Sequence, residues 1–156
     1  MVKQGENSKT VVKFSGIYTN TLDDKGRISI PAGLRERLES PVLVLTKGLE
    51  HCIWVLPPDY WEKLSEKILN PRSLDMEEAS LLHYRFIVPK QETGIDKNGR
   101  IAVPQSLRDY AGLSRECSIM GKGDYMELWD VEAYKEFEVL CEQGVRAAVK
   151  KLGSLW

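Results

Sequence analysis

LDDKGRISIP (residues 22–31) and IDKNGRIAVP (residues 95–104) are two copies of one phrase in a chain of 156 residues. The alignment continues without a gap, because Leu34-Arg35 after the first copy matches Leu107-Arg108 after the second. Asp, Gly, Arg, Ile and Pro recur in the same order, which indicates an internal repeat. We therefore expect two copies of one supersecondary unit, each displaying the same charged turn.

Each copy has the pattern of a β-hairpin that leads into a short helix. In the first copy, residues 14–22 are strand-like, residues 23–26 form a polar turn, and residues 27–30 alternate polar side chains with Ile at the period of a strand. The turn contains a Gly, which tolerates positive φ, beside side chains that hydrogen-bond nearby backbone. The Pro that ends each copy suits the first turn of a helix, where its missing N–H costs nothing. Leu34 with Leu38, or Leu107 with Ala111, would then face inward.

Two strand-like apolar runs and a helix follow in each half. The runs are residues 42–45, 52–56, 117–120 and 125–129. Asp59, Asp75 and Asp130 are candidate N-caps of the helices, because an Asp side chain accepts hydrogen bonds from the free N–H groups of a first helical turn. The order βαββα, present twice, predicts an α+β fold.

One domain made of two halves is expected, since 156 residues suit a single compact core. Residues 1–13 are polar and lack periodicity, which is typical of a flexible N-terminal arm. The domain is then residues 14–156, with one repeat at 14–70, the other at 91–152, and a helical connector at 71–90.

The composition is that of a globular protein without a membrane segment. Charged residues make up 29% of the chain and hydrophobic residues 42%. The apolar runs are too short to span a bilayer, and the N-terminus lacks the apolar core of a signal peptide, so a cytoplasmic protein is expected. Because the formal net charge is −1, attraction to nucleic acid must come from a local patch, or from several patches joined in an oligomer.

Enzyme chemistry is not indicated by the sequence. His51 beside Cys52, with His83 far away along the chain, lacks the spacing of a metal site or of a Cys-His nucleophile pair. Phosphate-cradling Gly loops, nucleophile elbows and His-Glu-x-x-His motifs are also missing. We expect no catalytic residue, metal, cofactor or small-molecule substrate. The tryptophans that lie in apolar or helical patterns are expected in the core, not as stacking platforms for single-stranded nucleic acid: Trp54, Trp61 and Trp129.

The charged turn is the candidate binding site. Asp23 and Arg27 lie four apart across the first turn, as do Asp96 and Arg100 across the second, and such a pair can simply be an exposed salt bridge. Turn geometry explains the Gly, but it does not demand an Arg at the same place twice. A guanidinium makes paired hydrogen bonds to phosphate or to the O6 and N7 edge of guanine, and a neighbouring Lys adds phosphate contacts. The candidate DNA-binding residues are Asp23, Lys25, Arg27, Asp96, Lys97 and Arg100.

The chain closely resembles the MraZ family of bacterial transcriptional regulators over residues 14–152. The resemblance is carried by Gly16-Ile17-Tyr18, Leu22-Asp23, Lys25-Gly26-Arg27, Pro31-Ala32 and Leu34-Arg35, and by the second copy of the motif. It implies an AbrB-like β-barrel of the double-psi or swapped-hairpin type, built from two βαββα repeats and flanked by helices. The two repeats of one chain would then replace the two chains of an AbrB-type dimer.

The same resemblance implies a function. Proteins of this family assemble into ring-shaped homo-oligomers and bind short direct repeats in double-stranded DNA upstream of the division and cell-wall gene cluster. Their Asp-x-x-x-Arg turns contact the DNA, and at the matching positions here these are Asp23, Arg27, Asp96 and Arg100. A cytoplasmic regulator associated with the nucleoid, and not with a membrane, is expected.

Several alternatives stay open at this point. The chain could be an AbrB-like antitoxin or transition-state-type regulator, although antitoxins of that type usually carry one copy of the motif, or a structural assembly protein without DNA readout. The Asp of each turn could orient its Arg or accept a hydrogen bond from cytosine N4. Residues 131–152 could form a helix that covers the barrel or one that binds a partner.

Overall fold

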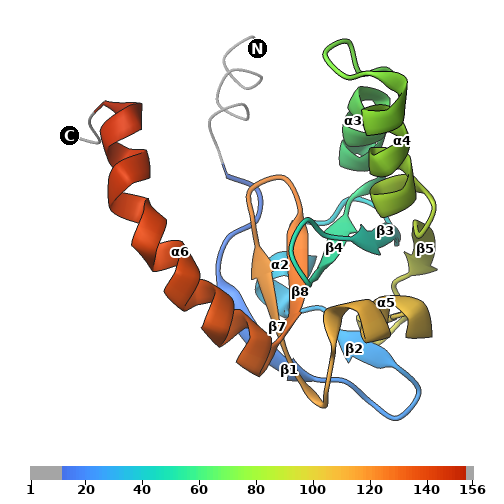
Figure 1. The fold of residues 1–156 in the computed structure, drawn as a ribbon. Helices are drawn as coiled ribbons and strands as arrows, with labels where there is room; N and C mark the ends of the chain where they lie inside the picture. Colours follow the sequence, from blue (N-terminus) through green and yellow to red (C-terminus); the bar gives the residue numbers. More distant parts are fainter. Residues whose placement is uncertain (1–11, 154–156) are drawn as a thin grey trace, which may run out of the picture.

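The computed structural model describes residues 12–153, so the predicted arm at residues 1–13 lies almost wholly outside the described residues. In chain order the elements are the strands β1 (Ile17–Thr21) and β2 (Arg27–Ser29), helix α2 (Ala32–Arg35), strands β3 (Val42–Lys47) and β4 (Ile53–Leu56), helices α3 (Pro58–Leu69) and α4 (Met76–Leu82), the π-helical turn η1 (His83–Ile87), strands β5 (Gln91–Gly94) and β6 (Arg100–Ala102), helix α5 (Gln105–Ala111), strands β7 (Glu116–Gly121) and β8 (Met126–Asp130), and helix α6 (Val131–Leu152). Figure 1 shows their arrangement. The α+β class is confirmed, and none of the described helices is both long and apolar enough to cross a membrane.

The two halves of the chain exchange strands. A six-stranded antiparallel sheet has the order β1-β7-β8-β4-β3-β5, and a separate two-stranded sheet consists of β2 and β6. Strand β1 of the first half therefore pairs with β7 of the second, and β5 of the second half pairs with β3 of the first. The expectation of a hairpin ladder within each copy is wrong, because β1 and β2 flank the predicted turn but pair with strands of the other half. Alternation of polar and apolar residues predicts a strand but not the strand with which it pairs.

The expected closed β-barrel is not what the structure contains. The large sheet is open, with β1 and β5 as its edges, and the β2–β6 ladder is not hydrogen-bonded into it. The two sheets instead enclose the core by packing of side chains from alternate strand positions, such as Leu43 and Leu45 of β3 and Ile53 and Val55 of β4. Ile28 and Ile101 of the small ladder close the core from the other side.

The short helices after the repeated phrase bury the predicted residues. Leu34 of α2 and Leu107 of α5 are both fully buried in the main core. Pro31 and Pro104 stand just before these helices as their N-cap residues. A helix therefore follows each phrase as the sequence predicts, but the Pro lies one residue before the expected first turn.

Helices cover the other face of the large sheet. Helix α3 and η1 pack on β3, and α6 packs on β7 and β8. Trp54 stacks on Phe86 of η1 with the ring centroids 5.0 Å apart, and Trp129 stacks on Phe137 of α6 at 4.7 Å. Trp129 is buried as predicted. Trp54 of β4 and Trp61 of α3 are half-buried.

Two of the three predicted helix caps are present. Asp75 forms a capping box, in which the Glu78 N–H donates to Asp75 Oδ1 at 2.8 Å and the Asp75 N–H donates to Glu78 Oε1 at 3.1 Å. Asp130 accepts from the Ala133 N–H at 3.2 Å. The prediction for Asp59 is wrong, because α3 already begins at Pro58, so that Asp59 lies inside its first turn.

Candidate nucleic-acid interface

The first charged turn is held by its own Asp. Backbone hydrogen bonds run from Asp23 N to Arg27 O at 2.9 Å and from Gly26 N to Asp23 O at 3.0 Å. Asp23 Oδ1 accepts from the N–H groups of Lys25 at 2.9 Å and Arg27 at 2.8 Å. Asp23 Oδ2 accepts from Arg27 Nε at 2.8 Å. One carboxylate thus fixes both the backbone of the turn and the guanidinium that follows it.

The second turn repeats this geometry. Asp96 Oδ1 accepts from the N–H groups of Asn98 at 2.8 Å and Arg100 at 2.9 Å, and Oδ2 accepts from Arg100 Nε at 3.0 Å. Backbone bonds from Asp96 N to Arg100 O and from Gly99 N to Asp96 O, both 2.9 Å, close the turn. Both copies of the phrase therefore fold into one local structure.

These hydrogen bonds also favour the ionised carboxylates. The Arg27 backbone N–H is the main cause that lowers the pKa of Asp23, although desolvation opposes it. The Arg100 backbone N–H has the same main effect on the pKa of Asp96, again against desolvation. Each Asp binds its Arg through Nε, and this contact leaves the two terminal nitrogens of the guanidinium for other hydrogen bonds. Of the two roles considered for Asp, the orienting contact is present in both turns.

The β2–β6 ladder places both Arg side chains on one face. Ile28 lies opposite Ile101, and both side chains are buried. Arg27 lies opposite Ala102 and Arg100 opposite Ser29, so both Arg side chains point to the other face, away from the core. The two arginines are diagonal neighbours, at a Cα separation of about 7–8 Å for such a pair. Roughly a third of each side chain is exposed.

The two candidate lysines are not at equivalent positions. Lys25 aligns with Asn98, and Lys97 aligns with Asp24. The first turn therefore carries two acidic and two basic residues, whereas the second carries Asp96 against two basic residues. Lys25 and Lys97 are both exposed. The second turn is the more positive of the two.

Two further arginines, which the sequence analysis did not assign to the site, lie against the turns. Gly26 and Gly99 both have φ of +77° and are buried, as a turn with a left-handed Gly requires. A Cβ built on Gly26 would lie 2.7 Å from Arg108 Cζ, and one on Gly99 would lie 2.9 Å from Arg35 Cζ. Each guanidinium thus lies against the turn of the other half. The matching Leu-Arg after each phrase was the sequence signal for these residues. The sequence does not show that the Arg of one half contacts the turn of the other half.

The neighbourhood of His51, Cys52 and His83 shows no catalytic arrangement. Burial raises the pKa of the Cys52 thiol strongly, which disfavours the nucleophilic thiolate. The His51 ring instead stacks on Tyr110 at 5.4 Å. Within residues 12–153, no group of three or more His, Cys, Asp or Glu side chains could hold a metal ion.

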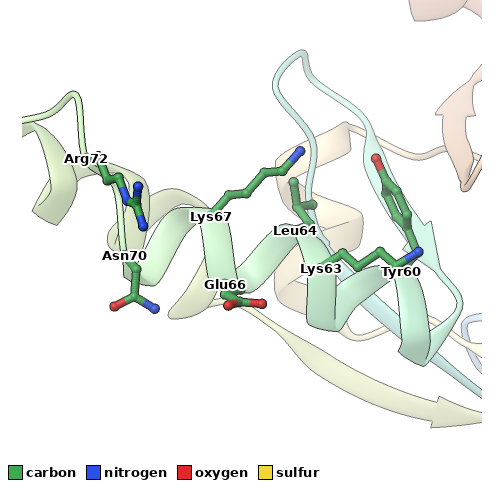
Figure 2. Close-up of a pocket in the computed structure, with 7 residues that line it drawn as sticks. All are labelled: Tyr60, Lys63, Leu64, Glu66, Lys67, Asn70 and Arg72. Atoms are coloured by element: carbon green, nitrogen blue, oxygen red, sulfur yellow. The ribbon is translucent and has the colours of Figure 1, made fainter.

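A groove of about 490 Å³ lies along α3, away from the turns. Figure 2 shows the seven side chains that line it: Tyr60, Lys63, Leu64, Glu66, Lys67, Asn70 and Arg72. Figure 1 places α3 at the end of the molecule opposite β2. The groove is therefore separate from the face that carries Arg27 and Arg100.

The sequence of the whole folded region identifies the family. Residues 14–83 and 86–150 match the profile of a family described as "MraZ protein, putative antitoxin-like". The chain belongs to the MraZ family. The resemblance inferred from the repeated turn is thereby confirmed.

Proteins named transcriptional regulator MraZ are similar to the chain over nearly their whole length. The one from Treponema denticola is 43% identical over 142 residues, which are 91% of this chain and 99% of that protein. The one from Treponema pallidum strain Nichols is 37% identical and covers 91% and 95%. The one from Thermomicrobium roseum is 37% identical and covers 84% and 92%. A solution structure of PHS018 from Pyrococcus horikoshii, with a TM-score of 0.31 and 16% identity over 74% of this chain and 87% of that one, is too distant to bear on the fold.

Proposed function

We propose that this chain is a transcriptional regulator that binds double-stranded DNA sequence-specifically through the outer face of the β2–β6 ladder and its two turns. The observation that carries the proposal is that this ladder presents Arg27 and Arg100 side by side, each held by its own Asp. The names of the similar MraZ proteins support a role in transcription.

The chemistry of the turns suits contact with DNA. A guanidinium fixed at Nε keeps its two terminal nitrogens for paired bonds to a guanine edge or to a phosphate. Lys25 and Lys97 supply phosphate contacts that set the position of the protein without reading the sequence. Arg35 and Arg108 support the turns from behind and add positive potential beneath them.

Assembly into a ring supplies the affinity that a chain of net charge −1 lacks. We propose that several subunits place their turns on one face and engage short direct repeats, upstream of the division and cell-wall gene cluster, in the same DNA. Linked weak contacts then replace a large basic surface. The exchange of β1 and β5 between halves supports an AbrB-like, swapped-hairpin origin of this architecture. Such a regulator acts in the cytoplasm at the nucleoid.

The test is DNA binding by the Arg27→Ala/Arg100→Ala double variant. Both side chains are partly exposed, so we expect wild-type thermal stability and oligomer mass, with specific binding to the promoter repeats reduced at least hundredfold. The matched control is Arg72→Ala, an exposed Arg at the α3 groove, which should bind like wild type. Unchanged affinity of the double variant would contradict the proposed function.

A further inference from the structure

The distal part of α6 presents an apolar stripe. Cys141, Val145, Ala148 and Leu152 recur at intervals of four, three and four residues, which places them on one face of the helix. Val145 is 48% exposed and Leu152 is 68% exposed. The distal part of α6 leaves the sheet, as Figure 1 shows, and the side chains of residues 138–152 are exposed except for the half-buried Val149. We call this face the α6 stripe.

A second apolar face lies on α4, η1 and Val88, the residue that follows η1. Leu81, Tyr84 and Val88 follow one another at intervals of three and four residues and are 64%, 68% and 67% exposed. Met76 at the start of α4 is 90% exposed. We call this the α4–η1 face; helices α4 and α6 lie on opposite sides of the subunit in Figure 1. One subunit therefore carries two different apolar faces, on helices that lie on opposite sides of it.

The charges beside the two faces are complementary in an antiparallel orientation. Helix α4 begins with acidic residues, Glu77 and Glu78, after its N-cap Asp75. Helix α6 ends with the basic residues Lys150 and Lys151. Placing the end of α6 beside the start of α4 pairs these groups and also aligns the two helix dipoles favourably.

The same orientation matches side-chain sizes. With Lys151 beside Glu77, an antiparallel register brings Tyr84 to Gly144 and Val88 to residues 140–141. A Cβ at Gly144 would have no atom within 4 Å, so the described part of the subunit leaves this position open. Small residues at a helix contact let a bulky partner approach closely. A large aromatic ring thus meets Gly144, which lies next to Val145 of the α6 stripe.

We propose that the α6 stripe of one subunit packs antiparallel on the α4–η1 face of the next copy of the chain. The contact joins two different faces, on helices at opposite sides of the subunit, so it is head-to-tail and generates a ring when the rotation closes. It rests on the homo-oligomer of the proposed function and names the surface that builds it. A symmetric contact between two α6 stripes would leave the α4–η1 face uncovered and would stop at a dimer.

Disulfide trapping tests the register. The variant Val88→Cys introduces a thiol that the proposed contact places near the exposed Cys141 of the next subunit, while Cys52 and Cys117 are buried. Mild oxidation should give a ladder of cross-linked trimers, tetramers and larger species, and Val88→Cys/Cys141→Ser should give none. Oxidised V88C protein that stops at dimers, or parent protein that forms Cys141 dimers just as readily, would overturn the proposal.

A pair of valines on α6 provides the matched test of assembly. Val145 lies on the stripe, whereas Val139, which is 63% exposed, lies off it. By light scattering, Val145→Glu should reduce the mass to a single chain and Val139→Glu should keep the wild-type mass, while the far-UV circular dichroism of both should match the wild type. A wild-type monomer would refute the ring in the proposed function itself. A wild-type oligomer that V145E leaves intact would refute only the contact proposed for it.

Discussion

The packing of each Arg against the other half's turn can be measured through glycine substitutions. Gly99 has φ of +77°, and a Cβ there would meet the Arg35 guanidinium. Gly112, which ends α5, has φ of +60°, but a Cβ there would meet nothing within 4 Å. Gly112→Ala therefore serves as a control that carries the backbone strain without the contact.

The two substitutions should lower the free energy of unfolding by different amounts. An Ala in the left-handed region is strained by roughly 1–2 kcal/mol. Ala also lowers the conformational entropy of the unfolded chain, which stabilises the folded state by about 0.4–1 kcal/mol. Gly112→Ala should therefore lower the free energy of unfolding by about 1 kcal/mol. Gly99→Ala must also displace Arg35, whose Nη1 donates to Ile30 O at 3.0 Å, and the loss of that bond adds about 1–2 kcal/mol. The total for Gly99→Ala is about 2–3 kcal/mol.

Thermal and urea unfolding would measure both costs. For a domain of this size, about 1 kcal/mol shifts the Tm by roughly 2–4 °C, so Gly99→Ala should shift the Tm two to three times as far as Gly112→Ala. In an Arg35→Ala background the added cost of Gly99→Ala should fall to that of Gly112→Ala. Equal costs for the two glycine variants, or an unchanged cost of Gly99→Ala without Arg35, would refute the contact between Arg35 and the second turn.

Two further predictions concern buried and paired carboxylates. The pKa values of Asp23 and Asp96 are lowered below 3.8 in the folded protein, so their ionised forms stabilise it above that pH and lose this effect as the pH falls through the lowered values. Asp23→Asn/Asp96→Asn should thus be less stable than wild type near neutral pH, with the difference shrinking in acid denaturation; a difference that persists in acid would contradict this origin. Glu127, only 6% exposed, accepts from the indole N–H groups of Trp54 at 3.0 Å and Trp129 at 2.9 Å. Glu127→Ala leaves both donors without their acceptor and should cost about 2–4 kcal/mol with a shift in tryptophan fluorescence; Glu132→Ala, whose carboxylate is exposed, is the control.

The sequence predicted the local structure of the site well because the repeat is a local signal. The turn residues, the Pro before α2 and α5, and the inward-facing Leu34 and Leu107 follow from chain order alone. The partner of each strand does not, since the alternation of β1 is satisfied equally by β2 and by β7. The pattern alone therefore predicted a hairpin within each copy, and the family resemblance implied a closed swapped-hairpin β-barrel, whereas the large sheet is open.

The same limit applies to the candidate site. The sequence showed the spacing of Asp23 and Arg27 and its repeat at Asp96 and Arg100. It did not show the β2–β6 ladder that joins the two turns. Arg35 and Arg108 look like ordinary surface residues of short helices until each is seen against a glycine of the other half. Contacts between distant segments depend on tertiary packing, which a residue pattern does not encode.

The most direct test of the account is a nuclease footprint on DNA upstream of the chain's own gene, made with the wild-type protein and with the Arg27→Ala/Arg100→Ala variant. The wild-type protein should protect an array of short, regularly spaced repeats, and the variant, at the same oligomer mass, should protect none. Equal protection by both proteins would contradict the claim that the paired turns of the β2–β6 ladder read DNA.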